Sequence, residues 1–515
     1  MIEILIGADV ILDVLLPIED YYSPSASLLN LCSENIIKGW ITADAYCLIY
    51  SCLREKGKIQ FSKNLLIDEL SYLSIIPTRY QTILDAHEFN NSNFTDNIQL
   101  VAAQSMNIDY LITRNTLDCS GSRVKVMLPS EFTNDLKNNT FIPIRDKIAF
   151  VDIKNQFHQI YNYIDDRINN VINETSFIKG KYVTEFENNF ADYCKGKYCI
   201  SVGNGTDALF IALKALNISY GDEVILPANS FIATSEAVTM AGAQIVFVDC
   251  DPKTYNIDVS LIESKITQKT KVIIPVHLYG QPANMPVLFE MAKKYNLKIV
   301  QDCAQAHGAT IEGKPLADYG DILCFSFYPG KNLGAYGDAG AIITNDSELA
   351  NRALMFANHG RKEKYNHEFE GINSRMDGIQ GAVLNVKLKY LDQWNESRIN
   401  SSMLYTDLLA DINLIQCPYS LPDVKHVYHL YVIRLKQRDE LQDYLTNNNI
   451  GTGIHYPIAL PNLKSYQYLN HQPADFPVAS QYQNEILSLP LYPGIDKEAV
   501  RHVSQIIKNF FVKGY

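Results

Sequence analysis

The stretch that decides the fold reads Ser326-Phe327-Tyr328-Pro329-Gly330-Lys331-Asn332-Leu333-Gly334. It follows an apolar run, Ile322–Phe325, which has the length and composition of a buried strand. A solvated lysine does not usually occur in a Pro/Gly turn directly after such a strand. A lysine that forms a Schiff base must be held close, partly desolvated and able to swing. A single lysine of this kind is structural more often than catalytic, so the surrounding motifs decide.

A Gly-rich turn, Gly203–Leu209, follows a strand expected at Tyr198–Val202 and opens a helix that continues through Leu213. A helix N-terminus preceded by glycines offers backbone N–H groups and a positive dipole end, which suits a phosphate. The Thr206 and Ser326 hydroxyls are placed to add donors. The fragment alone is equally typical of an ordinary turn capped by Thr or Asp.

A carboxylate ends another expected strand, in Val300-Gln301-Asp302-Cys303-Ala304-Gln305-Ala306-His307-Gly308. Ligands of open α/β sheets lie beyond the carboxyl ends of the strands. In that place Asp302 can hold a pyridinium nitrogen protonated, which makes the ring an electron sink. The alternative is an ordinary helix N-cap.

A fourth segment, Gly371–Asp377, by itself predicts only a loop before an apolar helix.

The remaining pattern predicts three domains and a linker. Residues 1–136 alternate apolar runs with amphipathic stretches, which favours a small α/β domain with a parallel sheet. Residues 137–147 are expected to be a linker, because the chain is polar and Asn-rich from Asn134 to Thr140 and Pro143 follows. Residues 148–390 are expected to form one large doubly wound domain, and residues 391–515 a smaller α+β domain. Strands are expected at Ile2–Ile6, Gly39–Thr42, Tyr110–Thr113, Glu223–Leu226, Gln244–Val248, Val272–Val276, Lys298–Gln301, Ala341–Thr344 and Tyr428–Arg434, and helices around Ser25–Cys32 and Asp96–Ser105.

The composition is that of a soluble globular protein too long for one core, with 515 residues, 47% hydrophobic and 20% charged. A net charge of −12 does not suit a general polyanion binder. Ten cysteines without a C-x-x-C pair favour free thiols in a reducing cytosol over zinc ligation or disulfides. The apolar start, Met1–Leu16, lacks a basic n-region and contains Asp9 and Asp13, so a signal peptide is not expected. No apolar run is long enough to span a membrane, and a cytoplasmic enzyme is expected.

Together, in this order and at these spacings, the motifs resemble the DegT/DnrJ/EryC1/StrS family of sugar aminotransferases, which depend on pyridoxal 5'-phosphate (PLP). The likeness runs from about Ile148 to the C-terminus, and it includes Phe177–Gly180, Pro227–Thr234, Asn358–Arg361, His455–Pro457 and Leu489–Pro493. It implies an α/β fold of fold type I, with the large doubly wound domain and a small C-terminal α+β domain, and a homodimer with shared active sites.

The resemblance implies a role for each motif residue. Lys331 is the catalytic Schiff-base lysine and proton shuttle, Asp302 pairs with the pyridine nitrogen, and Gln305 contacts the ring O3'. Phe231 lies on the ring face. The phosphate is held by Gly205, Thr206 and Ser326, with Asn373 reaching in from the second subunit.

The Ser326–Ala335 turn resembles enzymes that aminate C3 of dTDP-3-keto-6-deoxyhexoses, whereas C4 transaminases usually carry a different turn. In that subgroup the positions of Tyr328, Lys364, His455 and Tyr456 contact the sugar nucleotide; the alternatives are a solvated lysine and a packed aromatic turn. The implied reaction carries an amino group from L-glutamate to PLP and on to the ketone. A C4 transaminase stays open, and Lys331 argues against a PLP dehydratase that lacks the Schiff-base lysine. Gln301, often Glu in the family, and Pro461, near a frequent His, depart from the pattern.

Residues 1–136 resemble a PIN domain, a small α/β fold used by metal-dependent ribonucleases, through Ile4–Leu16, Phe94–Gln99 and Thr113–Asp118. Such nucleases gather three or four carboxylates around Mg²⁺ or Mn²⁺. Gly7 and Asn93 stand where relatives carry carboxylates, which leaves Asp9, Asp96 and Asp118 as possible metal ligands. A degenerate domain kept for packing, dimer contacts or partner binding is expected. The alternative is an active nuclease.

Overall fold

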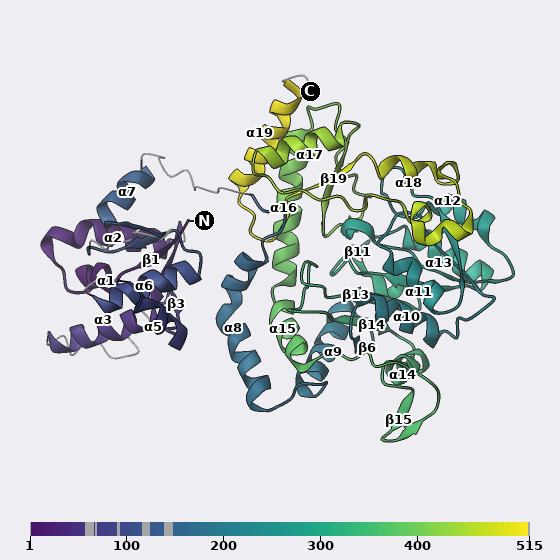
Figure 1. The fold of residues 1–515 in the computed structure, drawn as a ribbon, viewed down its shortest axis with the longest axis horizontal. Helices are drawn as coiled ribbons and strands as arrows, with labels where there is room; N and C mark the ends of the chain where they lie inside the picture. The colour runs from purple at the N-terminus through teal and green to yellow at the C-terminus, as the bar shows by residue number, and fades with distance from the viewer. Residues whose placement is uncertain are drawn as a thin grey trace. The chain divides into compact units, whose positions relative to one another are not determined.

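The computed structural model describes residues 2–34, 36–56, 66, 70–89, 93–115, 124–137 and 148–512. The chain divides into two compact units, residues 1–145 and 146–515 (Figure 1). Most of the expected linker, residues 138–147, lies outside the described ranges, and the domain boundaries expected after residues 136, 147 and 390 stay predictions. No helix in the described ranges has an apolar stretch of the length that a bilayer crossing needs.

The N-terminal unit is a parallel sheet with helices on both faces, purple and blue in Figure 1. The strand order is β3-β2-β1-β4-β5, and neighbouring strands are parallel. Ile4 and Ile6 pack on one face and Leu5 on the other, so β1 is buried on both sides, as a parallel strand requires. The elements are β1 (Ile2–Ile6), α1 (Ala8–Leu15), α2 (Glu19–Ser33), β2 (Ile37–Thr42), α3 (Ala43–Glu55), β3 (Ser74–Ile76), α5 (Tyr80–Ala86), α6 (Phe94–Ser105), β4 (Tyr110–Ile112), β5 (Lys125–Met127) and α7 (Pro129–Lys137).

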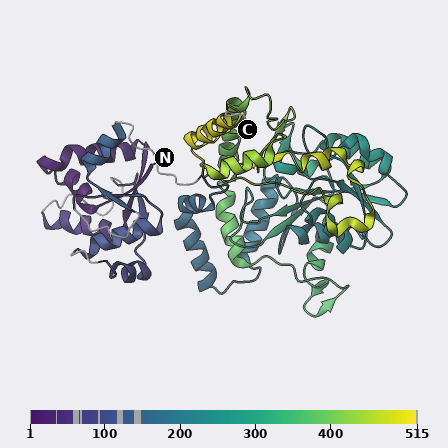
Figure 2. The ribbon, with the colours of Figure 1, turned by 45° about the horizontal axis from the view of Figure 1, so that its top comes forward.

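The second unit is built on a seven-stranded sheet of order β6-β14-β13-β10-β9-β7-β8. Strand β14 runs antiparallel to both of its neighbours, so the sheet is mixed. Helices α10, α11 and α14 pack on one face of the sheet, and α9, α13 and α15 on the other. Figures 1 and 2 show these helices around the sheet from two directions. The strands are β6 (Tyr198–Val202), β7 (Glu223–Pro227), β8 (Gln244–Val248), β9 (Thr270–Ile273), β10 (Lys298–Asp302), β13 (Ile322–Ser326) and β14 (Gly340–Thr344). The helices are α8 (Ile153–Asn173), α9 (Lys181–Cys194), α10 (Gly205–Ala215), α11 (Ala233–Met240), α12 (Val259–Ile262), α13 (Met285–Tyr295), α14 (Ser347–Phe356) and α15 (Gly378–Leu388).

Helix α16 (Leu391–Leu409) leads from this sheet into the C-terminal part. There the antiparallel pair β18 (Tyr431–Arg434) and β19 (Ile486–Leu489) shares a core with α16, α17 (Arg438–Asn447) and α19 (Lys497–Val512). Shorter elements complete the unit: β11 (Thr310–Ile311), β12 (Lys314–Pro315), β15 (Arg361–Glu363), β16 (Asn366–His367), β17 (Val424–Lys425) and α18 (Pro477–Tyr482). The 3₁₀ turns are Glu263–Lys265, Leu278–Gly280, Leu316–Asp318, Leu460–Asn462, Lys464–Leu469 and Pro473–Asp475.

Two strands of this unit begin or end at least two residues away from where the sequence predicts. Strand β9 ends at Ile273, because Pro275 has no N–H to donate to a ladder. Strand β18 begins only at Tyr431; Tyr428 has a φ of 41°, in the left-handed region that a strand does not use.

Candidate active site

Three strand ends meet at one edge of the seven-stranded sheet. Strand β10 ends at Asp302, β13 ends at Ser326, and β6 leads through a Gly-rich turn into α10. A Cβ atom on Gly205 would lie 2.5 Å from the Cβ of Ser326, so glycine alone lets these backbones approach. The structure therefore brings Gly205 and Ser326 together.

The N-terminus of α10 is capped, but by Asn204 rather than by Thr or Asp. The Asn204 side chain accepts a hydrogen bond from the Asp207 N–H at 2.8 Å. The Ser374 hydroxyl accepts from the Gly203 N–H at 2.9 Å and donates to the Asp207 carboxylate at 2.6 Å. First-turn N–H groups have no acceptor within their own helix, so those of Gly205 and Thr206 are available to an anion.

Asp302 is buried at the end of β10, with 6% of its surface exposed. Its carboxylate accepts hydrogen bonds from the Thr234 hydroxyl at 2.8 Å and from the Ala304 N–H at 3.1 Å. Burial raises the pKa of this carboxyl, and the two hydrogen bonds and the charge of Lys331 offset part of the rise. No helix follows Asp302, so the helix N-cap alternative is wrong.

Lys331 is half-buried in the turn after β13, where its N–H donates to the Tyr328 carbonyl at 2.8 Å. Burial lowers the pKa of Lys331 to about 8, and the charge of Asp302 acts in the opposite direction. The amine therefore reaches its neutral, nucleophilic form nearer to neutral pH than a solvated lysine does.

Phe231 and Tyr456 form an aromatic pair, called the aromatic wall below. The Phe231 ring is 53% exposed, and its centroid lies 5.7 Å from that of Tyr456. Gln305 is buried; its carbonyl accepts from the Tyr279 N–H at 2.6 Å and its amide donates to the Tyr456 hydroxyl at 3.1 Å. The Tyr279 hydroxyl also donates to the carbonyl of His455. Tyr279 and Gln305 thus fasten the His455–Tyr456 segment to the sheet domain.

His455 is held as a neutral side chain. Its Nδ1 lies 2.9 Å from the Ser488 hydroxyl, and its ring stacks on Phe150 with centroids 5.6 Å apart. Burial, followed by the charge of Lys331, lowers the pKa of His455 to about 4.

The remaining expected residues lie on exposed segments. Tyr328 is 61% exposed, and its N–H donates to the Ser326 hydroxyl at 3.3 Å. Lys364 is exposed in the turn of the β15–β16 hairpin, which projects from the sheet domain in Figure 1. Asn373 is exposed beside Ser374. Within the described chain, Lys364 and Asn373 make no hydrogen bond or ion pair to the other expected site residues.

The two departures from the family pattern lie outside this group. Gln301 is fully buried, bonded to His277 Nε2 at 2.9 Å and to the Leu316 carbonyl at 3.0 Å. Pro461 is buried in a 3₁₀ turn. The motifs did not mark Thr234 and Tyr279 as partners of Asp302 and Gln305. Thr234 ends a quoted motif, whereas Tyr279 has no local signal.

These residues fit PLP. Asp302 is a buried carboxylate at the end of β10, Lys331 is a lysine of lowered pKa in the turn after the neighbouring strand β13, and the N-terminus of α10 lies beside Ser326. On a mixed sheet of this order, they define a PLP-dependent enzyme of fold type I.

Comparison with known proteins names the group within that class. Residues 158–508 match the DegT/DnrJ/EryC1/StrS aminotransferase family, and the chain belongs to it. A dTDP-3-amino-3,6-dideoxy-alpha-D-galactopyranose transaminase of Aneurinibacillus thermoaerophilus is 45% identical over 70% of this chain and 99% of its own. The structure of S. venezuelae DesV aligns at 38% identity and a TM-score of 0.70, over 71% of this chain and 98% of that one. NtdA from Bacillus subtilis, solved with bound cofactor PMP, aligns at 34% identity and a TM-score of 0.62, over 67% and 82%.

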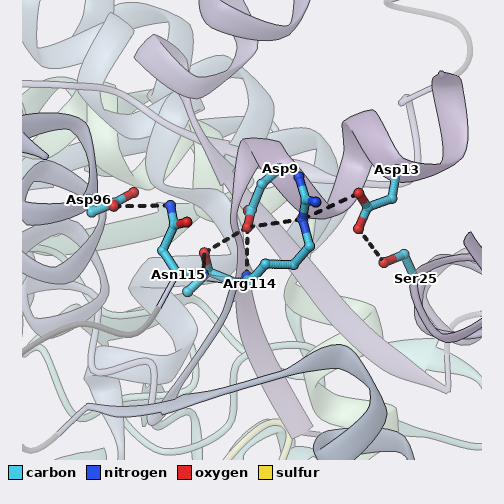
Figure 3. Close-up of polar contacts among 7 residues, drawn as sticks. Asp9, Asp13, Ser25, Asp96, Arg114 and Asn115 are labelled. Carbon is cyan, nitrogen blue, oxygen red and sulfur yellow. Dashed lines mark hydrogen bonds and ion pairs between the residues drawn. The ribbon is translucent and has the colours of Figure 1, made fainter. Parts of the chain in front are cut away.

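The N-terminal unit is a PIN domain, matched over residues 3–117. Asp9, Asp13 and Asp96 of this domain form hydrogen bonds or ion pairs with other protein side chains (Figure 3). The Asp9 carboxylate accepts from the Arg114 N–H at 2.6 Å and from the Thr113 hydroxyl at 3.0 Å. Arg114 Nε lies 3.7 Å from Asp9 and 3.3 Å from Asp13, which is fully buried and also accepts from Ser25.

In the described part of the PIN domain, the carboxylates that could hold a metal are bonded to other protein groups. Asp96 accepts a hydrogen bond from the Asn115 amide at 3.1 Å (Figure 3). A side chain on Gly7 would collide with the Asp9 carboxylate, so Asp9 fills the space of the missing first carboxylate. Asp118 lies outside the described residues. Within the described parts of the chain, no three His, Cys, Asp or Glu side chains are arranged to hold a metal ion.

Proposed function

We propose that the chain is a transaminase that carries an amino group from L-glutamate to C3 of a dTDP-3-keto-6-deoxyhexose, for amino-sugar biosynthesis in the cytoplasm. The observation that carries the amino-transfer chemistry is that Lys331 and the buried Asp302 lie at the same edge of the sheet, Lys331 in the turn after β13 and Asp302 at the end of the neighbouring strand β10. The turn from Ser326 to Ala335 and the name of the 45% identical relative support C3 and a dTDP-linked sugar.

Other relatives are named for substrates with a different nucleotide or a different sugar. A relative from Pseudomonas aeruginosa, 38% identical over 70% of this chain and all of its own, is named UDP-2-acetamido-2-deoxy-3-oxo-D-glucuronate aminotransferase. A 36% identical relative from Escherichia coli O157:H7 is named GDP-perosamine synthase. The first name is that of a 3-oxo sugar on a different nucleotide, and only the second supports the alternative for this chain, a C4 transaminase of a nucleotide-linked 4-keto-6-deoxy sugar.

Each site residue takes a role set by its position. Gly205, Thr206 and Ser326 bind the cofactor phosphate, and Phe231 covers the ring. Asp302 balances a protonated ring nitrogen, which lets the bound cofactor act as an electron sink. Lys331 would hold the cofactor through its side-chain amine and, once released, would act as the acid and base that moves the proton at the donor or sugar carbon. The Gln305 amide borders the ring, held by Tyr279 and Tyr456.

The sugar nucleotide is proposed to lie over the aromatic wall. Tyr328, His455 and Tyr456 are proposed to contact the sugar nucleotide there. A neutral His455 can accept or donate one hydrogen bond without adding charge. Lys364 offers a point charge to a pyrophosphate. Because Lys364 and Asn373 are exposed, we propose that each acts in the site of the second subunit of a homodimer.

The PIN domain is proposed to serve packing, dimer contacts or partner binding rather than RNA cleavage. Asp9 and Asp13 share the single positive charge of Arg114, and Asp96 is bonded to Asn115. RNA cleavage that depends on a divalent ion and disappears in Asp96→Ala would contradict this.

The test is the product formed from dTDP-4-keto-6-deoxyglucose, PLP and L-glutamate, with and without a 3,4-ketoisomerase, identified by mass and NMR. Amine at C3 only when the isomerase is present supports the proposal. Amine at C4 without the isomerase supports the alternative. Lys331→Ala is the control and should give no product in either case.

A further inference from the structure

The turn that carries Lys331 is held in place by hydrogen bonds from the side chain of the next residue, Asn332. Asn332 is 1% exposed, and its amide donates to the Asn395 side-chain carbonyl at 2.9 Å and to the Val427 carbonyl at 3.0 Å. Since both amide hydrogens are used, the Asn332 carbonyl is the acceptor for His429 Nδ1 at 3.1 Å. All the hydrogen-bonding groups of this side chain are thus directed at fixed partners.

Asn395 extends the connection to the segment that carries Asp302. It is fully buried on α16, and its amide donates to the His307 carbonyl at 2.8 Å. His307 lies two residues after Gln305, on the strand-end segment that begins at Asp302. The Asn332 side chain of the lysine turn and the backbone of the aspartate segment therefore share one buried polar partner, Asn395.

The C-terminal part closes the network. Val427 and His429 precede β18, and Arg398, one turn beyond Asn395 on α16, donates to the His429 carbonyl at 3.2 Å and to the Leu491 carbonyl at 2.9 Å. Burial holds the pKa of His429 well below its usual range, and the charges of Lys331 and Arg398 act in the same direction. His429 therefore adds no positive charge near Lys331.

We propose that Asn332 and Asn395 are positioning residues, which fix the Lys331 turn against the Asp302 segment through one hydrogen-bonded network. Gly330 and Gly334 flank Lys331 and Asn332, and glycine by itself restricts the backbone less than other residues do. The lysine side chain must swing during the reaction, so its backbone has to be held by other groups. The proposal rests on the PLP chemistry of the family and not on the identity of the sugar.

The test follows the visible absorption band of the cofactor bound to Lys331 as the pH is raised, in the full-length protein. In Asn332→Ala and in Asn395→Ala, the loosened turn admits water, which favours the protonated, charged form of the lysine–cofactor bond, so the midpoint of this titration should move upward. The value of kcat should fall roughly 10–100-fold, because small misplacements of a reacting group are costly, while KM for the amino donor changes by less than about threefold. The double variant should lose little more than the worse single variant, because the two residues act as one network.

Asn385→Ala is the matched control. Asn385 is also buried, accepts from the Asn189 amide at 2.9 Å and donates to the Tyr182 carbonyl at 3.1 Å, away from the lysine turn. It should lose stability but keep the wild-type titration midpoint and kcat. The proposal is overturned if folded Asn332→Ala keeps both, or if Asn385→Ala shifts them equally. A wrong sugar assignment would leave the band titration unaffected, so the two failures are distinguishable.

Discussion

Replacing Thr234 with valine tests how the site keeps Asp302 ionised. The change removes the hydroxyl that donates to the Asp302 carboxylate at 2.8 Å and preserves the branched shape of the side chain. A hydrogen bond to a charged group contributes about 1.5–3 kcal/mol, and one pKa unit corresponds to about 1.4 kcal/mol. The pKa of Asp302, which burial already raises, should therefore rise by a further one to two units or so.

A higher pKa means that more of the Asp302 carboxyl is protonated, and a protonated carboxyl cannot balance a positive ring nitrogen. PLP affinity of the cofactor-free protein, titrated by absorbance, should fall about 10- to 100-fold. The loss should be larger below neutral pH than above it, because raising the pH restores the carboxylate.

Ser230→Ala is the control for the Thr234 variant. The Ser230 hydroxyl lies 2.8 Å from that of Thr234, and no hydrogen bond joins it to Asp302. It should weaken PLP binding much less. If Thr234→Val binds PLP as tightly as the wild type on both sides of neutrality, the role given to this hydrogen bond is refuted.

Three further results are expected. Lys387 is fully buried, and burial lowers its pKa to about 7, below the unfolded value, so the unfolded chain binds the extra proton above that pH. The free energy of unfolding of the wild type, relative to that of Lys387→Met, should therefore increase as the pH rises above about 7, by at most ~1.4 kcal/mol per pH unit. Thermal unfolding measures this difference, and the control Lys389→Met, at an exposed position, should show no such trend. Arg114→Met leaves the buried Asp13 unpaired and should destabilise the PIN domain by about 3–5 kcal/mol, seen as faster proteolysis there while transamination persists. A chain that begins at Asp146 should keep transaminase activity, because relatives matched over nearly their whole length cover only about 70% of this one; a folded but inactive product would place the PIN domain in catalysis or assembly.

The main strands could be predicted because their apolar runs are continuous and end at Gly, Pro or Asp. Strands β3 and β5 could not: each has three residues at a sheet edge, and Ile75 of β3 is 42% exposed. The antiparallel direction of β14 was also beyond the sequence pattern, because a buried strand reads the same in either direction.

The residues that carry the chemistry could be proposed from the motifs, because each follows directly after a strand. Their supporting partners could not. Asn332 meets Asn395 and His429 across 63 and 97 positions of the chain, and Thr234 meets Asp302 across 68. No local period marks such pairs, which form only when the sheet, α16 and the C-terminal part pack together.

The central claim is that Lys331 is the lysine that holds the cofactor. Borohydride reduction of the PLP-loaded protein makes the lysine–cofactor bond permanent, and peptide mass spectrometry then locates it. The label should fall on the peptide that contains Lys331 and be absent from Lys331→Ala. Lys387 is the informative competitor, because it is also buried with a lowered pKa. A label on Lys387, or one that survives in Lys331→Ala, would contradict the account.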